Sequence, residues 1–366
     1  MHIIGKFFDG IVLLANLIVL GVFLISAFSD HISPQTIIYA SFLGLIFPFL
    51  LIVVILFLLY WIFRKRWYAF ITLFVLLLCW EPITRYVPYH ILGGTKTSAD
   101  STQIIKLLTY NTCGLGQNGS KKSGPELLEF IKNQDADIVC LQEYTFHNRP
   151  DKLTENKIKE TLSAYPYYIY TPASANYNSG VALFSKYPIE QVKAINYESL
   201  YNSSCFYKLN INGNHVALIN NHLESNQLSR EDREFYNQMI QHFDSNKLQE
   251  VRTTLIHKLK KAYIVRSVQA DTIHNMIEAL DMPVIVCGDF NDTPISYCYQ
   301  RIRGSLSDAF RESGFGPGIT YHEQRFLFRI DHIFHSKTMH AFNAKVHHVM
   351  YSDHYPVSVS LILPKK

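Results

Sequence analysis

Polar side chains that could bind a metal or a phosphate group follow an apolar run near the C-terminal third of the chain. The run 284–287 passes through a glycine and leads to Asp289, Asn291 and Asp292. A polar turn after a buried strand is common. The same residues would also fit a strand that carries a carboxylate and a carboxamide into a catalytic cleft. The other strand-like runs of the chain distinguish these two interpretations.

Several other apolar runs end in, or begin after, side chains of the same kind. Residues that are distant in sequence can converge at one edge of packed sheets, where loops carry function on a rigid scaffold. A polar side chain at the end of one strand, a polar tip, indicates only a turn. Polar tips on several strands predict one shared site. The set is Asn111, Glu143, His222, Asp289, Asn291, Asp331, Asp353 and His354.

The chemistry of this set is consistent with phosphoester hydrolysis. Hard oxygen ligands without thiolates suit Mg²⁺ or Mn²⁺ and not a structural zinc ion. Hydrolysis of a phosphate ester needs a metal to neutralise developing charge, a base to orient water, and donors for the phosphate oxygens. A histidine paired with an aspartate can act as that base or as an electrostatic stabiliser.

The motifs around these residues, in this order, resemble those of the endonuclease/exonuclease/phosphatase superfamily. GDFN or SDH alone would be unspecific, but six blocks in order, each at a strand end, make a specific match. The resemblance covers about 104–363 and implies an α/β fold: a four-layered sandwich of two central mixed β-sheets flanked by helices. The blocks are LTYNTCG with Asn111, IVCLQE with Glu143, NNHLES with His222, GDFND with Asp289 and Asn291, RIDHIF with Asp331, and SDHYP with Asp353 and His354.

The resemblance also implies a metal site. Glu143 would be the principal ligand of the cation, with Asn111 and Asp353 nearby. Some family members have an acidic residue two positions after the asparagine, and Cys113 departs from that pattern. Arg329 would be a phosphate contact or a surface residue.

The same resemblance implies roles for the remaining residues. Asp289 would position or activate the attacking water, and Asn291 would bind phosphate. His354, oriented by Asp331, would contact the scissile phosphate, and either Asp289 or His354 could be the base. His222 matches the position of a second catalytic histidine in DNase-like members.

Short apolar runs alternate with helical stretches from residue 104 onward, which predicts two packed sheets flanked by helices. The long insert at 226–280 has apolar residues at helical spacing in its second half, so we expect an amphipathic helix packed on a sheet. Its basic residues (Lys258, Lys260, Lys261 and Arg266) would face solvent, or else phosphate or lipid head groups. The expected strands are 104–111, 138–143, 167–172, 180–185, 204–211, 215–223, 284–290, 330–336, 343–350 and 356–363, and the expected helices are 124–134, 153–163, 228–243, 247–280 and 296–302.

The first 80 residues are far more apolar than the rest of the chain. The segments 11–28 and 37–63 are hydrophobic on all sides and long enough to cross a bilayer, whereas 67–80 is short for a span. Pro48 predicts a kink in the second segment. A cleaved signal peptide is the alternative for the first segment, but its apolar core is long and a second span follows at once. We expect two to three membrane helices over 1–80, a linker over 81–103 and a catalytic domain over 104–366.

Basic residues in the short loops predict the orientation in the membrane. The loop 29–36 has no Lys or Arg, whereas the loop 64–66 reads RKR, which places that loop in the cytoplasm. Three spans would put the catalytic domain outside the cytoplasm, and two spans would put it inside. We expect an integral protein of the cell or inner membrane with an extracytoplasmic catalytic domain.

The sequence is compatible with more than one class of substrate. Residues 101–366 contain 28 Lys and Arg against 26 Asp and Glu, whereas a duplex-DNA binder usually has a clearer basic footprint. The anchor favours a phosphate ester near the bilayer, either a phospholipid head group or nucleic acid. No protein partner is expected, and the lipid bilayer is the partner of the N-terminal helices. The alternative function is a catalytically silent, membrane-tethered module that binds phosphate or another ligand.

Overall fold

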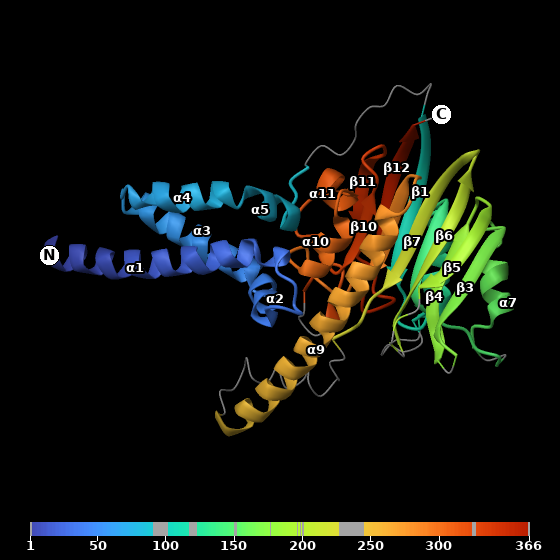
Figure 1. Cartoon of the computed structure of the whole chain (residues 1–366), viewed down its shortest axis with the longest axis horizontal. Coiled ribbons are helices and arrows are strands. Elements are labelled where there is room, and N and C mark those ends of the chain that lie inside the picture. Colours follow the sequence, from blue (N-terminus) through green and yellow to red (C-terminus); the bar gives the residue numbers. More distant parts are fainter. Residues whose placement is uncertain are drawn as a thin grey trace.

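The computed structural model describes residues 2–90, 102–116, 123–149, 152–175, 177–195, 197, 199, 201–226, 245–323 and 327–364. Figure 1 shows that apolar N-terminal helices project to one side of a layered β-sandwich formed by the rest of the chain.

Two six-stranded sheets form the centre of the sandwich. The first has the order β11-β12-β1-β2-β4-β3, and the second has the order β5-β6-β7-β8-β10-β9. The first sheet consists of β1 (Thr102–Asn111), β2 (Ile138–Tyr144), β3 (Tyr167–Ser174), β4 (Tyr177–Ser185), β11 (His340–Val346) and β12 (Val357–Pro364). The second consists of β5 (Ile189–Ile195), β6 (Ser203–Ile211), β7 (Asn214–His222), β8 (Val284–Asp289), β9 (Ser307–Asp308) and β10 (Asp331–His335).

Strand direction brings the polar tips to one edge of both sheets. β1 pairs with β2 and β7 pairs with β8 in parallel, so these four strands end on the same side. β12 and β10 run antiparallel to β1 and β8, so they begin where the parallel strands end. The register sets Asn111 opposite Gln142, and it sets both His222 and Asp331 opposite Asp289.

Alternating apolar residues build three buried layers around the two sheets. Successive side chains of a strand point to opposite faces. Ile105 and Leu107 therefore enter the core between the sheets, whereas Leu108 and Tyr110 pack under the outer helices. Helices α6 (Gly124–Asn133) and α7 (Glu155–Thr161) cover the first sheet, and α9 (Ser245–Glu278) and α10 (Tyr297–Arg303) cover the second. This arrangement confirms the expected four-layered α/β sandwich.

The elements that differ from expectation lie where pairing with a neighbour decides the structure. Strand β5 was not expected, because its sequence mixes polar and apolar residues that are mostly exposed. Its pairing with β6 holds it in place. The short β9 and helix α11 (Ala309–Ser313) were also not expected. Strand β11 begins at residue 340 and ends at 346, whereas the expected strand ran from 343 to 350, and its pairing with β12 shifts register between Phe342 and Lys345. The helix expected at 228–243 lies outside the described residues.

The insert forms the long helix α9, as expected, and its last half packs on the second sheet through Ala270, Ile273 and Ile277. Its first half extends away from the sandwich (Figure 1). Arg266 faces neither solvent, which was the expectation, nor phosphate or lipid, because it is buried and its Nε lies 3.3 Å from the Asp292 carboxylate.

The N-terminal region contains α1 (His2–Ala27), a short 3₁₀ helix η1 (Ser29–His31), α2 (Ile38–Leu45), α3 (Phe47–Phe63), α4 (Tyr68–Leu78) and α5 (Trp80–Tyr86). Among the described residues, one helix over Phe7–His31 is long and apolar enough to cross a membrane. Three helices qualify if the pairs α2–α3 and α4–α5, which bend by 55° and 66°, each count as one broken span. Length and composition thus allow the two to three spans that we expect.

Two details of this region differ from expectation. The bend expected at Pro48 lies at Ile46, because a proline is tolerated in the first turn of a helix and Pro48 lies in the first turn of α3. The linker expected from residue 81 is wrong at its start, since α5 continues to Tyr86 and packs against α11. Residues 91–101 lie outside the described part of the chain.

Gly288 generates a prediction about the fold, because β8 approaches the backbone of β7 at this position. Gly288 has φ +126°, and an added Cβ would lie 2.0 Å from the carbonyl oxygen of Asn221. We expect Gly288→Ala to destabilise the protein by roughly 3 kcal/mol and to lower its midpoint of thermal unfolding in detergent. Gly213→Ala is the control, since Gly213 has φ +89° and no atom within 4 Å. Equal losses for the two variants would contradict the close approach.

Candidate active site

The polar tips of the central strands meet at one edge of the sandwich, as the sequence predicted. Asn111 is the last residue of β1, and Glu143 lies near the end of β2. His222 and Asp289 are the last residues of β7 and β8, and Asp331 is the first residue of β10. The turn before β12 adds Asp353 and His354.

The Asn111 carboxamide joins the two sheets at this edge. Its Nδ2 donates to Glu143 Oε1 at 3.1 Å and to Asp289 Oδ2 at 2.8 Å. Its Oδ1 accepts a hydrogen bond from the backbone N–H of Cys113 at 3.1 Å. In this orientation Asn111 acts as a donor to two carboxylates from different sheets, and its oxygen is not directed at the position between them.

His354 and Asp331 form a buried pair. His354 Nδ1 lies 2.9 Å from Asp331 Oδ2, and His354 Nε2 lies 3.7 Å from Asp289 Oδ2. Burial alone would lower the pKa of His354, but the carboxylates of Asp331 and Asp289 outweigh it and raise that pKa well above its ordinary value. The structure therefore favours an imidazolium at His354, with its Nε2 directed toward Asp289.

His222 has the opposite protonation preference in the same site. Its Nε2 lies 3.6 Å from Glu143 Oε1 and 4.0 Å from Asp289 Oδ2. Burial lowers the pKa of His222, although the Asp289 carboxylate opposes this change. Asn202 Nδ2 lies 3.3 Å from the same ring nitrogen. A neutral and a charged imidazole beside one carboxylate is a pattern that separates acid, base and electrostatic roles.

Two site residues have a backbone conformation that side chains rarely adopt. Glu143 has φ +48° and Asn291 has φ +53°. Such positions cost of order 1–3 kcal/mol each and persist where the surrounding structure holds them. Asn291 is held by hydrogen bonds from its N–H to Asp289 Oδ1 at 2.8 Å and from its Nδ2 to the carbonyl oxygen of Leu223 at 2.9 Å.

The donor set fits a divalent cation. Ligand atoms of Asp289, Asp331 and His354 lie within 4.8 Å of one another, which is a different grouping from the expected ligands Asn111, Glu143 and Asp353. Burial, and then the charge of Asp353, raise the pKa of Glu143, whose side chain is 36% exposed. Burial raises the pKa of Asp289 to about 6. Crowded carboxylates with raised pKa values indicate negative charge that a bound cation would neutralise.

The polar contacts beneath the site were not predicted from the sequence. Gln142 Nε2 donates to Asn220 Oδ1 at 2.6 Å, between the two sheets. Asn220 Nδ2 donates to the carbonyl oxygens of Leu141 and Ala182, each at 3.2 Å. A polar residue at a core-facing position of an apolar strand is the signal that could have found this pair. Arg329 was expected as a phosphate contact or a surface residue, and the surface alternative is wrong because Arg329 is buried.

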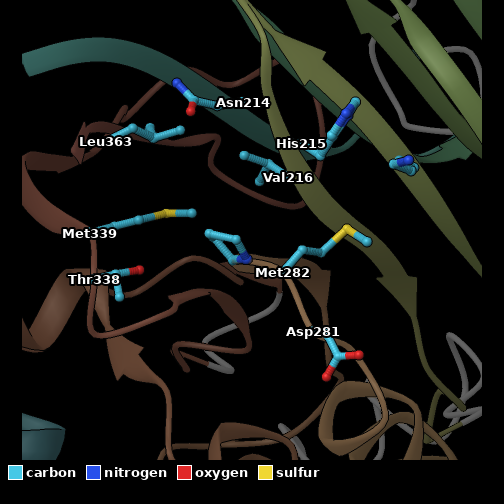
Figure 2. Close-up of a pocket in the computed structure, with 10 residues that line it drawn as sticks. Asn214, His215, Val216, Asp281, Met282, Thr338, Met339 and Leu363 are labelled. Atoms are coloured by element: carbon cyan, nitrogen blue, oxygen red, sulfur yellow. The ribbon is translucent and has the colours of Figure 1, made fainter. Parts of the chain in front are cut away.

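A separate cavity of about 390 Å³ lies at the other end of the strands (Figure 2). Figure 2 shows Val216 at the start of β7 beside Met339 and Leu363. The nine residues of β7 span roughly 26 Å, so this cavity and His222 lie at opposite edges of the sheet. The cavity is therefore not part of the site.

Two sequence families match the chain. The model of the Endonuclease/Exonuclease/phosphatase family matches residues 108–251 and 264–354, which is more than half of the chain. A model described as a domain of unknown function (DUF8431) matches residues 9–86. No curated protein gives a significant match.

Several solved structures are similar to this chain. The endonuclease/exonuclease/phosphatase from Beutenbergia cavernae DSM 12333 has a TM-score of 0.51 and 17% identity, over 72% of this chain and 72% of that chain. A humanized D. rerio TDP2 with 14 mutations has a TM-score of 0.49 and 14% identity, over 70% and 98% of the chains. The mannosyl-6-phosphatase of Bacteroides thetaiotaomicron VPI-5482 has a TM-score of 0.47 and 18% identity, over 70% and 99%. The first of these shows that the fold is shared.

The raised pKa of Asp289 generates a prediction about stability. Its folded-state pKa of about 6 exceeds the ordinary 3.8, so the protonated form is favoured by folding. Its contribution to stability is present below pH 3.8 and is lost as the pH rises through about 6, a loss of roughly 3 kcal/mol. We expect Asp289→Asn to raise the midpoint of thermal unfolding at pH 7.5 in EDTA, and this difference should disappear near pH 4.

The control is Asp281→Asn, because Asp281 is exposed. Its unfolding midpoint should stay within about a degree of the wild-type value at both pH values. A lower midpoint for Asp289→Asn than for wild type at pH 7.5 would contradict the inferred cost of the buried charge.

Proposed function

Because this chain belongs to the endonuclease/exonuclease/phosphatase family, we propose that it is a membrane-anchored, divalent-metal-dependent hydrolase of phosphate esters. One observation supports this most: five polar side chains contact one another at one edge of the sandwich. They are Asn111, Glu143, Asp289, Asp331 and His354. The contacts among these five side chains support hydrolysis over the catalytically silent alternative.

The proposed roles of His354 and Asp289 follow from the charges of their side chains. His354, held as an imidazolium by Asp331, would donate a hydrogen bond to a phosphate oxygen and stabilise the negative charge that develops there. Asp289 accepts the Asn111 N–H and lies beside both imidazoles, so it would orient or deprotonate the attacking water. Its pKa of about 6 leaves it ionised at neutral pH, as a base requires.

A metal ion fits the remaining donors. Glu143 and Asp353, with the nearby oxygens of Asp289 and Asp331, would hold Mg²⁺ or Mn²⁺, whose chemistry would be to neutralise charge on the phosphate oxygens. Asp331 Oδ1 is buried and has no hydrogen-bond partner among the described residues, so it is available for this purpose. The neutral His222, beside Glu143 and Asp289, would contact the substrate from the other side of Asp289.

The substrate is proposed to be a phosphodiester or phosphomonoester that reaches the membrane surface, either in nucleic acid or in a phospholipid head group. The nearly balanced charge of residues 101–366 gives nucleic acid no broad electrostatic attraction. The domain boundaries proposed from the sequence shift slightly: the membrane region would include α5, and the catalytic domain would begin at β1.

We expect the full chain in lipid nanodiscs with Mg²⁺ to hydrolyse a generic phosphodiester. EDTA should abolish this activity and added Mg²⁺ should restore it. His354→Gln should lower kcat/KM by about 100-fold or more, because it removes the charged donor. The panel of substrates is plasmid DNA, single-stranded RNA, sphingomyelin and phosphoinositides.

The matched control is His340→Gln, because His340 is exposed and lies outside the site. It should retain full activity. Hydrolysis that survives both EDTA and His354→Gln would refute the proposal. Hydrolysis of nucleic acid alone, or of lipid alone, would decide between the two substrate classes.

The proposed orientation gives a second test. Figure 1 shows the N-terminus and the α3–α4 turn at the end of the bundle far from the sandwich. Arg64 and Arg66 of that turn pair with Asp9 at 3.0 and 2.5 Å. Positive charge at this end favours the cytoplasm, so the catalytic domain would lie on the other side.

We therefore expect a membrane-impermeant maleimide to label Lys132→Cys, but not Lys65→Cys, in intact cells. Both residues lie outside the hydrophobic segments, in the catalytic domain and in the α3–α4 turn respectively, and both should react after cell lysis. The reverse pattern would place the catalytic domain in the cytoplasm.

A further inference from the structure

An arginine of the N-terminal region is buried against the catalytic sandwich. Arg85 lies in the last turn of α5, and its side chain is 1% exposed. Its Nη1 lies 2.6 Å from Asp30 Oδ2 of η1, whose side chain is fully buried, and donates to Gln300 Oε1 of α10 at 2.9 Å. The ion pair joins η1 to α5, and the hydrogen bond to Gln300 joins α5 to α10. Loss of the Arg85 charge would leave the Asp30 carboxylate buried without this cation, which is strongly destabilising.

The backbone of the same residue reaches the catalytic domain at a second position. The carbonyl oxygen of Arg85 accepts a hydrogen bond from Nη2 of Arg329. Arg329 is 2% exposed, and its guanidinium lies 4.8 Å from the ring centroid of Phe310. Arg329 is thus held between the N-terminal region and α11.

Arg329 precedes Asp331, the carboxylate that pairs with His354, by two residues. The carbonyl oxygen of Ile330 accepts from the N–H of Phe290 at 2.9 Å, which ties this segment to the residue after Asp289. Asp331 then binds His354 through a single carboxylate oxygen. A displacement of Arg329 would therefore be transmitted to the Asp331–His354 pair and to the Asp289 strand end.

We propose that Arg85 is a positioning residue for the active site. The Asp30–Arg85 pair, which the N-terminal helices supply, fixes Arg329 and through it the orientation of Asp331 toward His354. The N-terminal region then acts as a structural part of the active site in addition to an anchor. This inference rests on the proposed function where its readout is hydrolysis, but its effect on the 329–331 segment does not.

A second ion pair on the same interface provides a matched control. Arg311 Nη1 lies 2.7 Å from Glu81 Oε1, and it also joins α5 to the sandwich. Both side chains are partly exposed. Glu81 Oε2 also lies 3.6 Å from Nη2 of Arg85, so the control changes Arg311 and leaves Arg85 with both of its acidic neighbours. Loss of this pair should loosen the interface slightly without reaching the active site, since exposed pairs contribute little.

The first measurement is hydrogen–deuterium exchange of full-length Arg85→Gln and Arg311→Gln in nanodiscs. We expect the amides of 329–335 to exchange at least five-fold faster in Arg85→Gln and at the wild-type rate in Arg311→Gln. Arg85→Lys, which keeps a charge beside Asp30, should recover much of the protection. Unchanged exchange in Arg85→Gln would overturn the inference whether or not the protein hydrolyses phosphate esters.

The second measurement is a double-mutant cycle on hydrolysis. Arg85→Gln and Arg329→Gln should each lower kcat by ten-fold or more and change KM less than two-fold. The kcat of the double variant should be no lower than that of the less active single variant. Additive losses in kcat, or a kcat for Arg85→Gln equal to that of Arg311→Gln, would overturn the inference. An inactive wild type would refute the proposed function instead, and the exchange measurement would still decide the role of Arg85.

Discussion

The candidate active site depends on one carboxamide that connects two separate sheets. Asn111 donates to Glu143 within its own sheet and to Asp289, 178 residues later, in the other sheet. Beneath it, Gln142 and Asn220 hydrogen-bond across the same gap. Buried polar groups are costly unless they are fully paired, so these contacts permit few relative positions of the sheets. The polar tips can form one site because the sheets are held in this register.

The charges at this edge are unfavourable for folding and useful for chemistry. Asp289 is buried beside Asp331, and its pKa is raised to about 6. Glu143 and Asn291 have positive φ values, which adds conformational cost at the same place. The apolar layers on both faces of each sheet supply the stability that maintains this arrangement. A site that is locally unstable within a well-packed scaffold is expected where function requires particular charges and orientations.

The N-terminal helices and the sandwich share a buried, packed interface. The fully buried pair Asp30–Arg85 and the hydrogen bond from Arg329 lie at this boundary, and they are as deeply buried as the core of the sandwich. A flexible linker would expose such charges to water. The observed packing therefore makes the orientation of the sandwich relative to the N-terminal helices a property of the fold.

Much of the fold and the candidate site could be predicted from residue patterns alone, because they depend on local periodicity and on residue type. The strands β1, β2, β7 and β8 are apolar runs of strand length, and the polar residue at each tip marks the edge that they share. The long apolar segments likewise indicate membrane helices whatever their surroundings.

Contacts between distant residues and the degree of burial could come only from the tertiary structure. Strand β5 exists because β6 pairs with it, and its own side chains are mostly exposed. His222 and His354 are the same residue type, yet burial favours the neutral form of one and two carboxylates favour the charged form of the other. Arg85 looked like part of a linker, and only its burial against Asp30 and Gln300 connects it to the site. These features depend on distances between segments that sequence spacing does not contain.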